Sequence, residues 1–380
     1  MRSIAGLLLA VALTVAIVAA GFGAFNVYKG RNANPQLAGK PFASPTAPTV
    51  SVKTHPPSPA PPGPTALPVT GFGRIVVDGA SRHVFVSSPR SSAIVVLDLS
   101  GHIVRTITDE PGADAMVVIG SVLYVTLTTA GAIDAIDTKK LSRIRTLTTG
   151  LVSPMDLVAA GARIWTTTGP CAHWSTQLVG VDLDSGTKHT FTLPTESLLS
   201  YCAAFAANDR TSNLILAWSM GLDPAEISVI DVSTGSPVFV LSAREERLGN
   251  LEDVAFTRDR TRFITASGAP YEFDEWNVSD LNQDGVIYPA GPYPVAVAVN
   301  ANGTETMAGG LSDPNGQDVY EYAIGWPSAA LQGRHTGTTG NQVYSRGLAF
   351  SVDGSSLFVL TGGQTPGSGI VTFNVIPASA

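Results

Sequence analysis

The chain has 380 residues, of which 44% are hydrophobic and 14% charged, with 23 basic against 30 acidic residues. All the acidic residues lie beyond residue 70, so the later region holds 30 Asp and Glu against 18 Lys and Arg once the five N-terminal basic residues are set aside. This acidic balance lacks the clustered basic surface of a nucleic-acid-binding protein, and we expect no nucleic-acid partner.

Residues 1–27 contain an apolar run from Ile4 to Phe25 without a single charge. This length matches a helix that crosses the hydrocarbon core of a membrane, so we predict a single-pass anchor with the rest of the chain extracytoplasmic. The alternative is a secretory signal peptide in which Val18 and Ala20 are the small residues before the cleavage site. Cleavage there would release a secreted protein. Orientation stays open, because the basic residues that follow the run outnumber Arg2 before it, although long domains translocate regardless of charge.

Residues 28–70 form a predicted linker. Between Pro35 and Pro68 the sequence has 11 of its 26 prolines, mixed with Ser, Thr and Ala and with no acidic residue. This composition is typical of an extended, polyproline-like spacer, and a disordered tail has the same composition.

Residues 71–380 contain seven copies of one repeat. Each copy has a short β-rich run with a bulky central residue, namely Phe85, Tyr124, Trp165, Leu216, Phe263, Met307 and Phe358. A second strand in each copy ends at Asp98, Asp137, Asp182, Asp231, Asn277, Ala323 and Asn374, at intervals of 39, 45, 49, 46, 46 and 51 residues. A period near 45 residues is the length of a propeller blade.

The first copy predicts the blade architecture. Between Phe72 and Thr108 four β-rich runs are separated by Gly, Asp, Ser and Pro, as a four-stranded antiparallel sheet requires. The last copy ends with its third strand at residues 369–376, so we expect a strand at residues 64–70 to complete it and close the ring. The predicted fold is an all-β, seven-bladed β-propeller of four-stranded blades, preceded by an apolar helix and a Pro-rich linker.

Several segments carry a resemblance to the YVTN-type and NHL-like propeller repeats. The pattern of an inner strand, an Asp-Gly turn and a following strand is present in Ala349-Phe-Ser-Val-Asp-Gly-Ser-Ser-Leu-Phe-Val359. Leu123-Tyr-Val-Thr126 is close to the YVTN string that gives the repeat its name. Such propellers include surface proteins, lactonase relatives and binding subunits, so the resemblance implies an architecture and leaves the activity open.

Site residues are expected where the connection into each inner strand and the loop between the second and third strands open on one face. Alignment of the inner strands places Asp114, Asp156, Asp253 and Arg346 at similar positions, with Glu252 beside Asp253. These side chains could bind a hard cation or a polar ligand at the channel mouth. The alternative is that each Asp caps its local turn.

Cys171 and Cys202 are the only cysteines, and both map to this face between neighbouring blades. In an oxidising compartment we predict a disulfide between them, which would gather His173, Trp174 and Tyr201 into a ligand-binding patch. The alternative is two isolated buried thiols.

The long loop of the fifth repeat adds Tyr271 and Glu272, a mixture of aromatic and acidic groups suited to cations or sugars. The alternative places Tyr271, Phe273 and Glu275 on the buried face of the third strand.

Asp280, Asn282 and Asp284 precede Gly285 in the first half of a calcium-loop pattern, so Ca²⁺ is a possible cofactor. The twelfth position is Gly291 rather than Glu, which excludes an EF-hand and leaves an ordinary hairpin turn as the alternative.

The sequence has no G-x-S-x-G elbow, no H-E-x-x-H, no P-loop and no C-x-x-C motif, and the six histidines show no metal-ligand spacing. We therefore expect a membrane-tethered extracytoplasmic propeller that binds a small ligand or a protein, with no catalytic residue identified. The alternative is a metal-dependent, lactonase-like hydrolase that uses the carboxylates of the channel mouth.

Overall fold

The computed structural model describes residues 63–207, 212–300, 302, 305–313, 319–324, 330–335, 342–362 and 369–378. The predicted apolar helix at 4–25 and all of the linker before residue 63 lie outside these ranges. Within them, no helix has the length and apolar character needed to cross a membrane.

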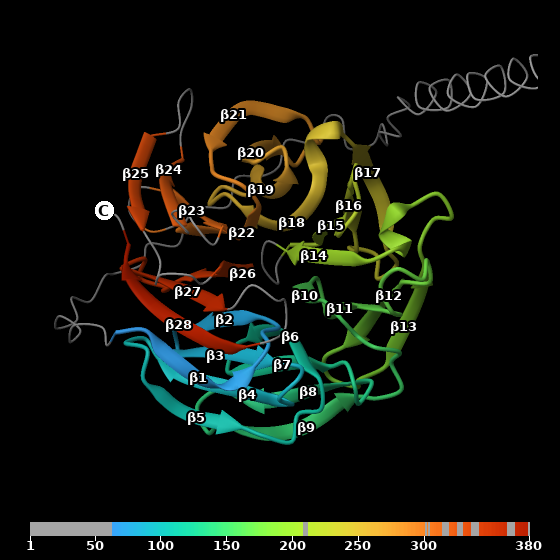
Figure 1. Cartoon of the computed structure of the whole chain (residues 1–380). Coiled ribbons are helices and arrows are strands. Elements are labelled where there is room, and N and C mark those ends of the chain that lie inside the picture. Colours follow the sequence, from blue (N-terminus) through green and yellow to red (C-terminus); the bar gives the residue numbers. More distant parts are fainter. Residues whose placement is uncertain are drawn as a thin grey trace, which may run out of the picture. The chain divides into compact units, whose positions relative to one another are not determined.

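The described residues form seven four-stranded antiparallel sheets, which confirms the predicted seven-bladed propeller (Figure 1). Each blade is named here after the repeat that forms it. Blades 1 to 3 consist of β2 (Ile75–Asp78), β3 (His83–Ser88), β4 (Ala93–Asp98) and β5 (Ile103–Ile107); β6 (Ala113–Ile119), β7 (Val122–Leu127), β8 (Ala132–Asp137) and β9 (Ser142–Thr148); and β10 (Leu157–Ala160), β11 (Arg163–Thr168), β12 (Gln177–Asp182) and β13 (Lys188–Thr192).

The remaining blades repeat this order. Blades 4 and 5 consist of β14 (Ala203–Ala207), β15 (Leu214–Ser219), β16 (Glu226–Asp231) and β17 (Val238–Arg244); and β18 (Gly249–Phe256), β19 (Arg262–Ala269), β20 (Glu272–Asn277) and β21 (Gln283–Pro289). Blades 6 and 7 consist of β22 (Pro294–Asn300), β23 (Thr306–Leu311), β24 (Val319–Ala323) and β25 (Ala330–His335); and β26 (Gln342–Phe350), β27 (Ser356–Gly362), β28 (Ile370–Pro377) and β1 (Thr65–Thr70). Two short 3-10 helices, η1 (Leu198–Ser200) and η2 (Glu246–Leu248), lie in the connections that enter blades 4 and 5.

The seven inner strands contact one another in sequence around the axis, and the ring closes where β26 meets β2. The core lies between adjacent blades. All seven bulky residues predicted from the repeat are buried on the second strands, from Phe85 on β3 to Phe358 on β27. Their side chains pack with apolar residues of neighbouring strands, so each blade buries its faces against its neighbours.

The polar residues predicted at the ends of the third strands form tight turns. The Asp98 carboxylate accepts hydrogen bonds from the backbone N–H groups of Ser100 and His102, at 2.9 and 3.0 Å. The Asp137 carboxylate accepts equivalent bonds from Lys139 and Lys140. These Asx-type turns explain why an acidic residue recurs at the end of this strand.

The N-terminal strand closes the ring as predicted. β1 pairs with β28 as the outer strand of blade 7, so the propeller begins at Thr65, before residue 71. Leu67 and Val69 face inward and are 4% and 5% exposed, within a core cluster shared with blades 1 and 7. The outer edge of β28 is therefore paired and covered.

We expect Leu67→Ala to lower the free energy of unfolding by about 2–3 kcal/mol, because it leaves a cavity in the cluster that joins the first and last blades. Urea denaturation at equilibrium measures this change. Ala66→Gly is the matched control on the same strand, since Ala66 is exposed. A loss below about 0.5 kcal/mol for Leu67→Ala would contradict the role of β1 as a closing strand.

Two faces follow from the connectivity. The upper face carries the loops between second and third strands and the connections that lead into the inner strands; the lower face carries the other turns. Thr65 donates a hydrogen bond from Oγ1 to the carbonyl of Gly101, in the turn between β4 and β5. The chain therefore joins the propeller at its lower face.

Candidate functional site

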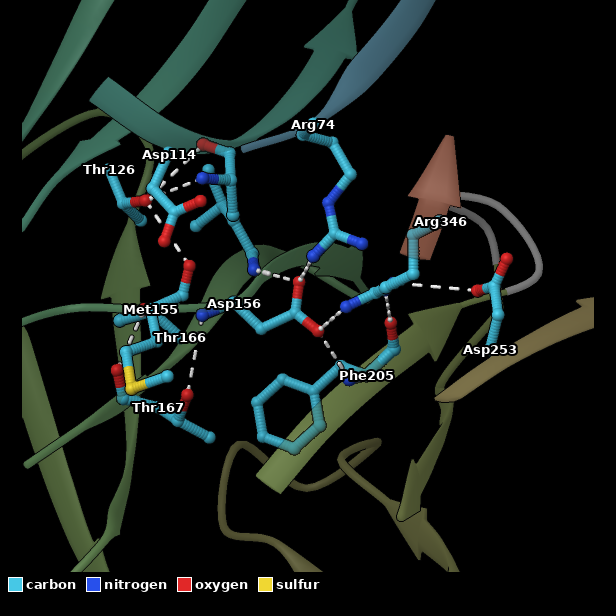
Figure 2. A network of polar contacts seen from close by, with 12 residues as sticks. Arg74, Asp114, Thr126, Met155, Asp156, Thr166, Thr167, Phe205, Asp253 and Arg346 are labelled. Atoms are coloured by element: carbon cyan, nitrogen blue, oxygen red, sulfur yellow. Dashed lines mark hydrogen bonds and ion pairs between the residues drawn. The ribbon is translucent and has the colours of Figure 1, made fainter. Parts of the chain in front are cut away.

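Charged side chains from blades 1, 3, 5 and 7 converge beside the inner strands (Figure 2). Arg74 and Asp156 directly precede the inner strands β2 and β10, whereas Asp253 and Arg346 lie within β18 and β26. Blades 3 and 7 are far apart around the ring, so contacts between them cross the central channel. The structure brings together Asp156, Asp253 and Arg346, three of the residues that the alignment of inner strands places at similar positions.

Asp156 is the centre of this network and is only 4% exposed. Its Oδ1 accepts a hydrogen bond from Nη2 of Arg74 at 2.7 Å, and its Oδ2 accepts one from Nη1 of Arg346 at 2.7 Å. The backbone N–H groups of Leu157 and Phe205 donate to the same carboxylate, at 2.9 and 2.6 Å. Burial alone would raise the pKa of Asp156, but Arg346 and Arg74 outweigh it and hold this pKa below its usual value.

Asp253 repeats part of this arrangement in blade 5. One carboxylate oxygen accepts the N–H of Val254 at 2.9 Å, and the other accepts the N–H of Val297 in the inner strand of blade 6, also at 2.9 Å. Burial raises the pKa of Asp253, and Arg346 opposes that rise. Asp156 and Asp253 therefore each bond to the inner strand of the next blade. In the alternative, each Asp would only cap its own local turn.

Arg346 links four blades. Its Nη2 donates to the carbonyl of Phe205 at 3.1 Å, and its Nε lies 3.4 Å from Oδ1 of Asp253. The guanidinium also lies over the ring of Trp218, 5.1 Å from the centroid, in a cation–π contact. Its φ of 60° is unusual for a residue with a side chain, so the backbone is strained where this side chain is directed across the channel.

Glu252 lies on the same inner strand as Asp253 and contacts blade 7. Its Oε2 accepts a hydrogen bond from Oγ of Ser345 at 2.9 Å. Burial raises the pKa of Glu252. Glu252 therefore strengthens the contact between blades 5 and 7 next to the charged network.

Asp114 belongs to the same group but has a different environment. It is half-buried, and its carboxylate accepts no hydrogen bond from the residues that the structure describes. A side-chain carbon at Gly73 would lie 2.7 Å from Oδ1 of Asp114 and 2.7 Å from Oγ of Ser87, so only glycine leaves room for this carboxylate. Burial raises the pKa of Asp114 to about 6, with Arg74 opposing the rise and Asp156 adding to it.

Asp114→Asn is expected to stabilise the protein above pH 6 by on the order of 1 kcal/mol, after allowance for solvent screening of the half-buried carboxylate. The raised pKa means that the protonated side chain favours the folded state, and this contribution is lost as the pH rises from the unfolded value of 3.8 to about 6. The variant has no such loss, so its advantage should be seen at pH 7.5 and disappear near pH 4. Urea denaturation at both pH values tests this, with exposed Asp184→Asn as the control that should show no such dependence.

The predicted disulfide is present, with the Cα atoms of Cys171 and Cys202 4.5 Å apart. It holds the loop after β11 against the connection that leads into β14, and the N–H of Ala172 donates to the carbonyl of Tyr201 at 2.9 Å. The rings of Trp174 and Tyr201 meet edge to face with centroids 5.1 Å apart, and His173 beside them is exposed. The structure thus brings together Trp174 and Tyr201, two of the three residues predicted to form a patch, and His173 precedes Trp174 in the same loop.

Tyr271 forms a second aromatic pair on the upper face. Its ring meets that of Tyr293 edge to face, with centroids 5.0 Å apart, and the two residues are 47% and 52% exposed. Phe273 and Glu275 point into the core, so the alternative of a buried face holds for these two residues and is wrong for Tyr271. Glu272 is half-buried and forms an ion pair with Arg247.

The calcium-loop residues do not converge on a common point. The N–H and Nδ2 of Asn282 both donate to the carboxylate of Asp280, at 2.9 and 2.7 Å. Asp284 instead lies 3.4 Å from Nη1 of Arg262. Over the described ranges, no group of three or more His, Cys, Asp or Glu side chains is placed to bind a metal ion. Asp280 and Asn282 therefore bond to each other, whereas Asp284 is directed to Arg262.

Two important residues were absent from the sequence-based prediction. Arg74 precedes β2 as Asp156 precedes β10, so extending the same alignment to blade 1 would have found it. Tyr293 directly precedes β22, in the connection equivalent to the one that carries Tyr201. An alignment of all the connections into inner strands contains both signals.

Similar solved structures share the propeller fold. U3-55K is 13% identical with a TM-score of 0.61, over 84% of this chain and 100% of that one. Virginiamycin B lyase from Staphylococcus aureus is 14% identical with a TM-score of 0.61, over 82% and 99%. Hydrazine synthase from Kuenenia stuttgartiensis is 13% identical with a TM-score of 0.57, over 88% and 99%.

No protein-family model matches the sequence, and no curated protein matches it. At these identities the likeness to solved structures concerns the fold alone. The chain is a seven-bladed β-propeller, structurally similar to virginiamycin B lyase and to the other solved structures named above.

Proposed function

We propose that this protein is a membrane-tethered, extracytoplasmic propeller of the YVTN-type or NHL-like group, and that it binds its ligand or protein partner on the upper face. The observation that carries the proposal is the presence of two exposed aromatic pairs on this face, Trp174 with Tyr201 and Tyr271 with Tyr293. Trp174 is 55% exposed and Tyr271 47% exposed, although each ring is held by a second ring. Rigid, exposed aromatic side chains are typical anchors of binding surfaces.

The central ion pairs support a rigid scaffold beneath this surface. Arg346 and Arg74 connect blades 7 and 1 to Asp156 of blade 3, so both oxygens of the Asp156 carboxylate are already paired with guanidinium groups. A side chain that is held by several partners loses little conformational entropy when a ligand binds nearby. The network therefore favours a role in shaping the binding face.

The attachment point of the linker is compatible with this assignment. The chain joins the propeller at Thr65 on the lower face, where Thr65 is bonded to Gly101. Residues 63–65 therefore enter the propeller away from the loops of the upper face. The Cys171–Cys202 disulfide supports an oxidising, extracytoplasmic compartment, because disulfides rarely persist in a reducing cytosol.

Site-specific photo-crosslinking in intact producing cells tests the proposal. A photoreactive amino acid at position 174 or 271 should give discrete, higher-mass adducts. The same group at position 352, in a lower turn, or at position 144, on the outer strand of blade 2, is the matched control, because Val352 and Ile144 are 61% and 54% exposed. Adducts that form equally from all four positions, or only from the controls, would refute an upper-face binding site.

A further inference from the structure

The two exposed aromatic pairs are built in the same way, two blades apart. Trp174 comes from the loop between the second and third strands of blade 3, and Tyr201 from the connection into blade 4. Tyr271 and Tyr293 occupy the corresponding loop of blade 5 and the connection into blade 6. Trp174 and Tyr293 both have a positive φ, at 52° and 58°, which is a costly conformation for aromatic residues.

The loops between the two pairs carry a strong excess of negative charge. The segments 193–202, 220–225 and 245–250 contain four acidic residues and one basic residue, Arg247. Glu196, Asp223 and Glu245 are exposed, whereas Arg247 already pairs with Glu272 and Asp274. Arg244, directly before Glu245, pairs with Glu226 and donates to the carbonyl of Glu196, and the three exposed acidic residues still outnumber the two arginines of this region.

Backbone hydrogen bonds connect these loops into one continuous stretch of the upper face. The N–H of Met220 donates to the carbonyl of Cys202, and the N–H of Asn250 donates to the carbonyl of Leu222, both at 2.9 Å. The side chain of Arg247 then bonds to Glu272, directly after Tyr271. The aromatic pairs and the acidic loops therefore lie along one connected arc from blade 3 to blade 6.

We propose that this acidic–aromatic surface, made of Trp174, Tyr201, Glu196, Asp223, Glu245, Tyr271 and Tyr293, binds an extended Lys- or Arg-bearing segment of a partner protein. Cationic side chains are attracted to the faces of aromatic rings and to carboxylates, and this surface offers both. Aromatic pairs at its two ends suit a segment that places cations at separate points along its length. This inference rests on the proposed function, because it names the partner of the same face.

The test uses the full-length protein in detergent micelles and three defined probes measured by isothermal titration calorimetry. Acetylated hexa-arginine should bind at low salt and weaken steeply as the salt concentration rises, whereas hexa-glutamate and the neutral glycan chitohexaose should not bind. Trp174→Ala should weaken hexa-arginine binding about threefold to fivefold, as expected for one exposed cation–π contact. Glu245→Gln should weaken it by at least twofold.

Matched variants separate this surface from the acidity of the whole molecule. Asp184→Asn removes one exposed negative charge from the lower face, and Ile144→Ala removes an exposed apolar side chain from the outer strand of blade 2; neither should change the affinity. Equal weakening by Asp184→Asn and Glu245→Gln would overturn the inference, as would tighter binding of chitohexaose or hexa-glutamate. If the crosslinks from positions 174 and 271 form but hexa-arginine does not bind, the proposal of an upper-face binding site is retained. The inference that its partner carries a Lys- or Arg-bearing segment is then refuted.

Discussion

Replacing Arg346 by alanine is expected to lower the free energy of unfolding by about 3–5 kcal/mol. The substitution leaves Asp156 without one of its two guanidinium partners and removes the cation nearest to Asp253. Asp156 and Asp253 are only 4% and 7% exposed, so the charge that remains has little access to water. Removal of one partner of a buried ion pair is costly because the other charge stays desolvated.

Equilibrium urea denaturation at pH 7.5 measures this loss, and two further variants separate its causes. Arg346→Lys retains the charge but cannot donate to both Asp156 and Phe205 in the same way, so we expect it to recover only part of the stability. Arg90→Ala, which removes an exposed arginine from the upper loop of blade 1, should change the stability by less than about 0.5 kcal/mol. A loss below about 1 kcal/mol for Arg346→Ala would show that the axial ion pairs do not hold the ring together.

Loss of the disulfide through Cys171→Ser together with Cys202→Ser is expected to lower the free energy of unfolding by about 3–4 kcal/mol. The bond closes a loop with a sequence separation of 31 residues, which restricts the unfolded chain. It also anchors the loop that presents Trp174 next to Tyr201. We therefore expect faster amide hydrogen exchange in residues 169–176, with blade 1 unaffected.

Reduction of the native protein provides an independent control for the same effect. Treatment with dithiothreitol should reproduce both the loss of stability and the faster exchange, whereas the serine variant should not respond to the reductant. A serine variant as stable as the native protein would indicate that the blade 3 and blade 4 loops are held by packing alone.

The architecture could be predicted from the sequence alone, whereas the disulfide was predicted with two isolated thiols as the alternative, and the structure confirms the bond. Blade number follows from a pattern that repeats within about 45 residues, and Phe85 and its six equivalents are buried as the pattern requires. Turn residues such as Asp98 act through bonds to their immediate neighbours, so local sequence contains the whole signal. The truncated last repeat similarly predicted the closing strand β1, because an unpaired edge has to be covered.

Which side chains meet, and how strongly each charge is desolvated and paired, follows from the three-dimensional fold. Asp114 and Asp156 occupy similar positions in the alignment, yet Asp156 binds two arginines and Asp114 accepts no hydrogen bond within the described part of the chain. Arg346, one of the two arginines that bind Asp156, lies 190 residues further along the chain. A repeat pattern carries no information about such contacts across the channel. Side-chain direction, desolvation and charge pairing depend on the closed ring, so they could not be predicted from the spacing of residues.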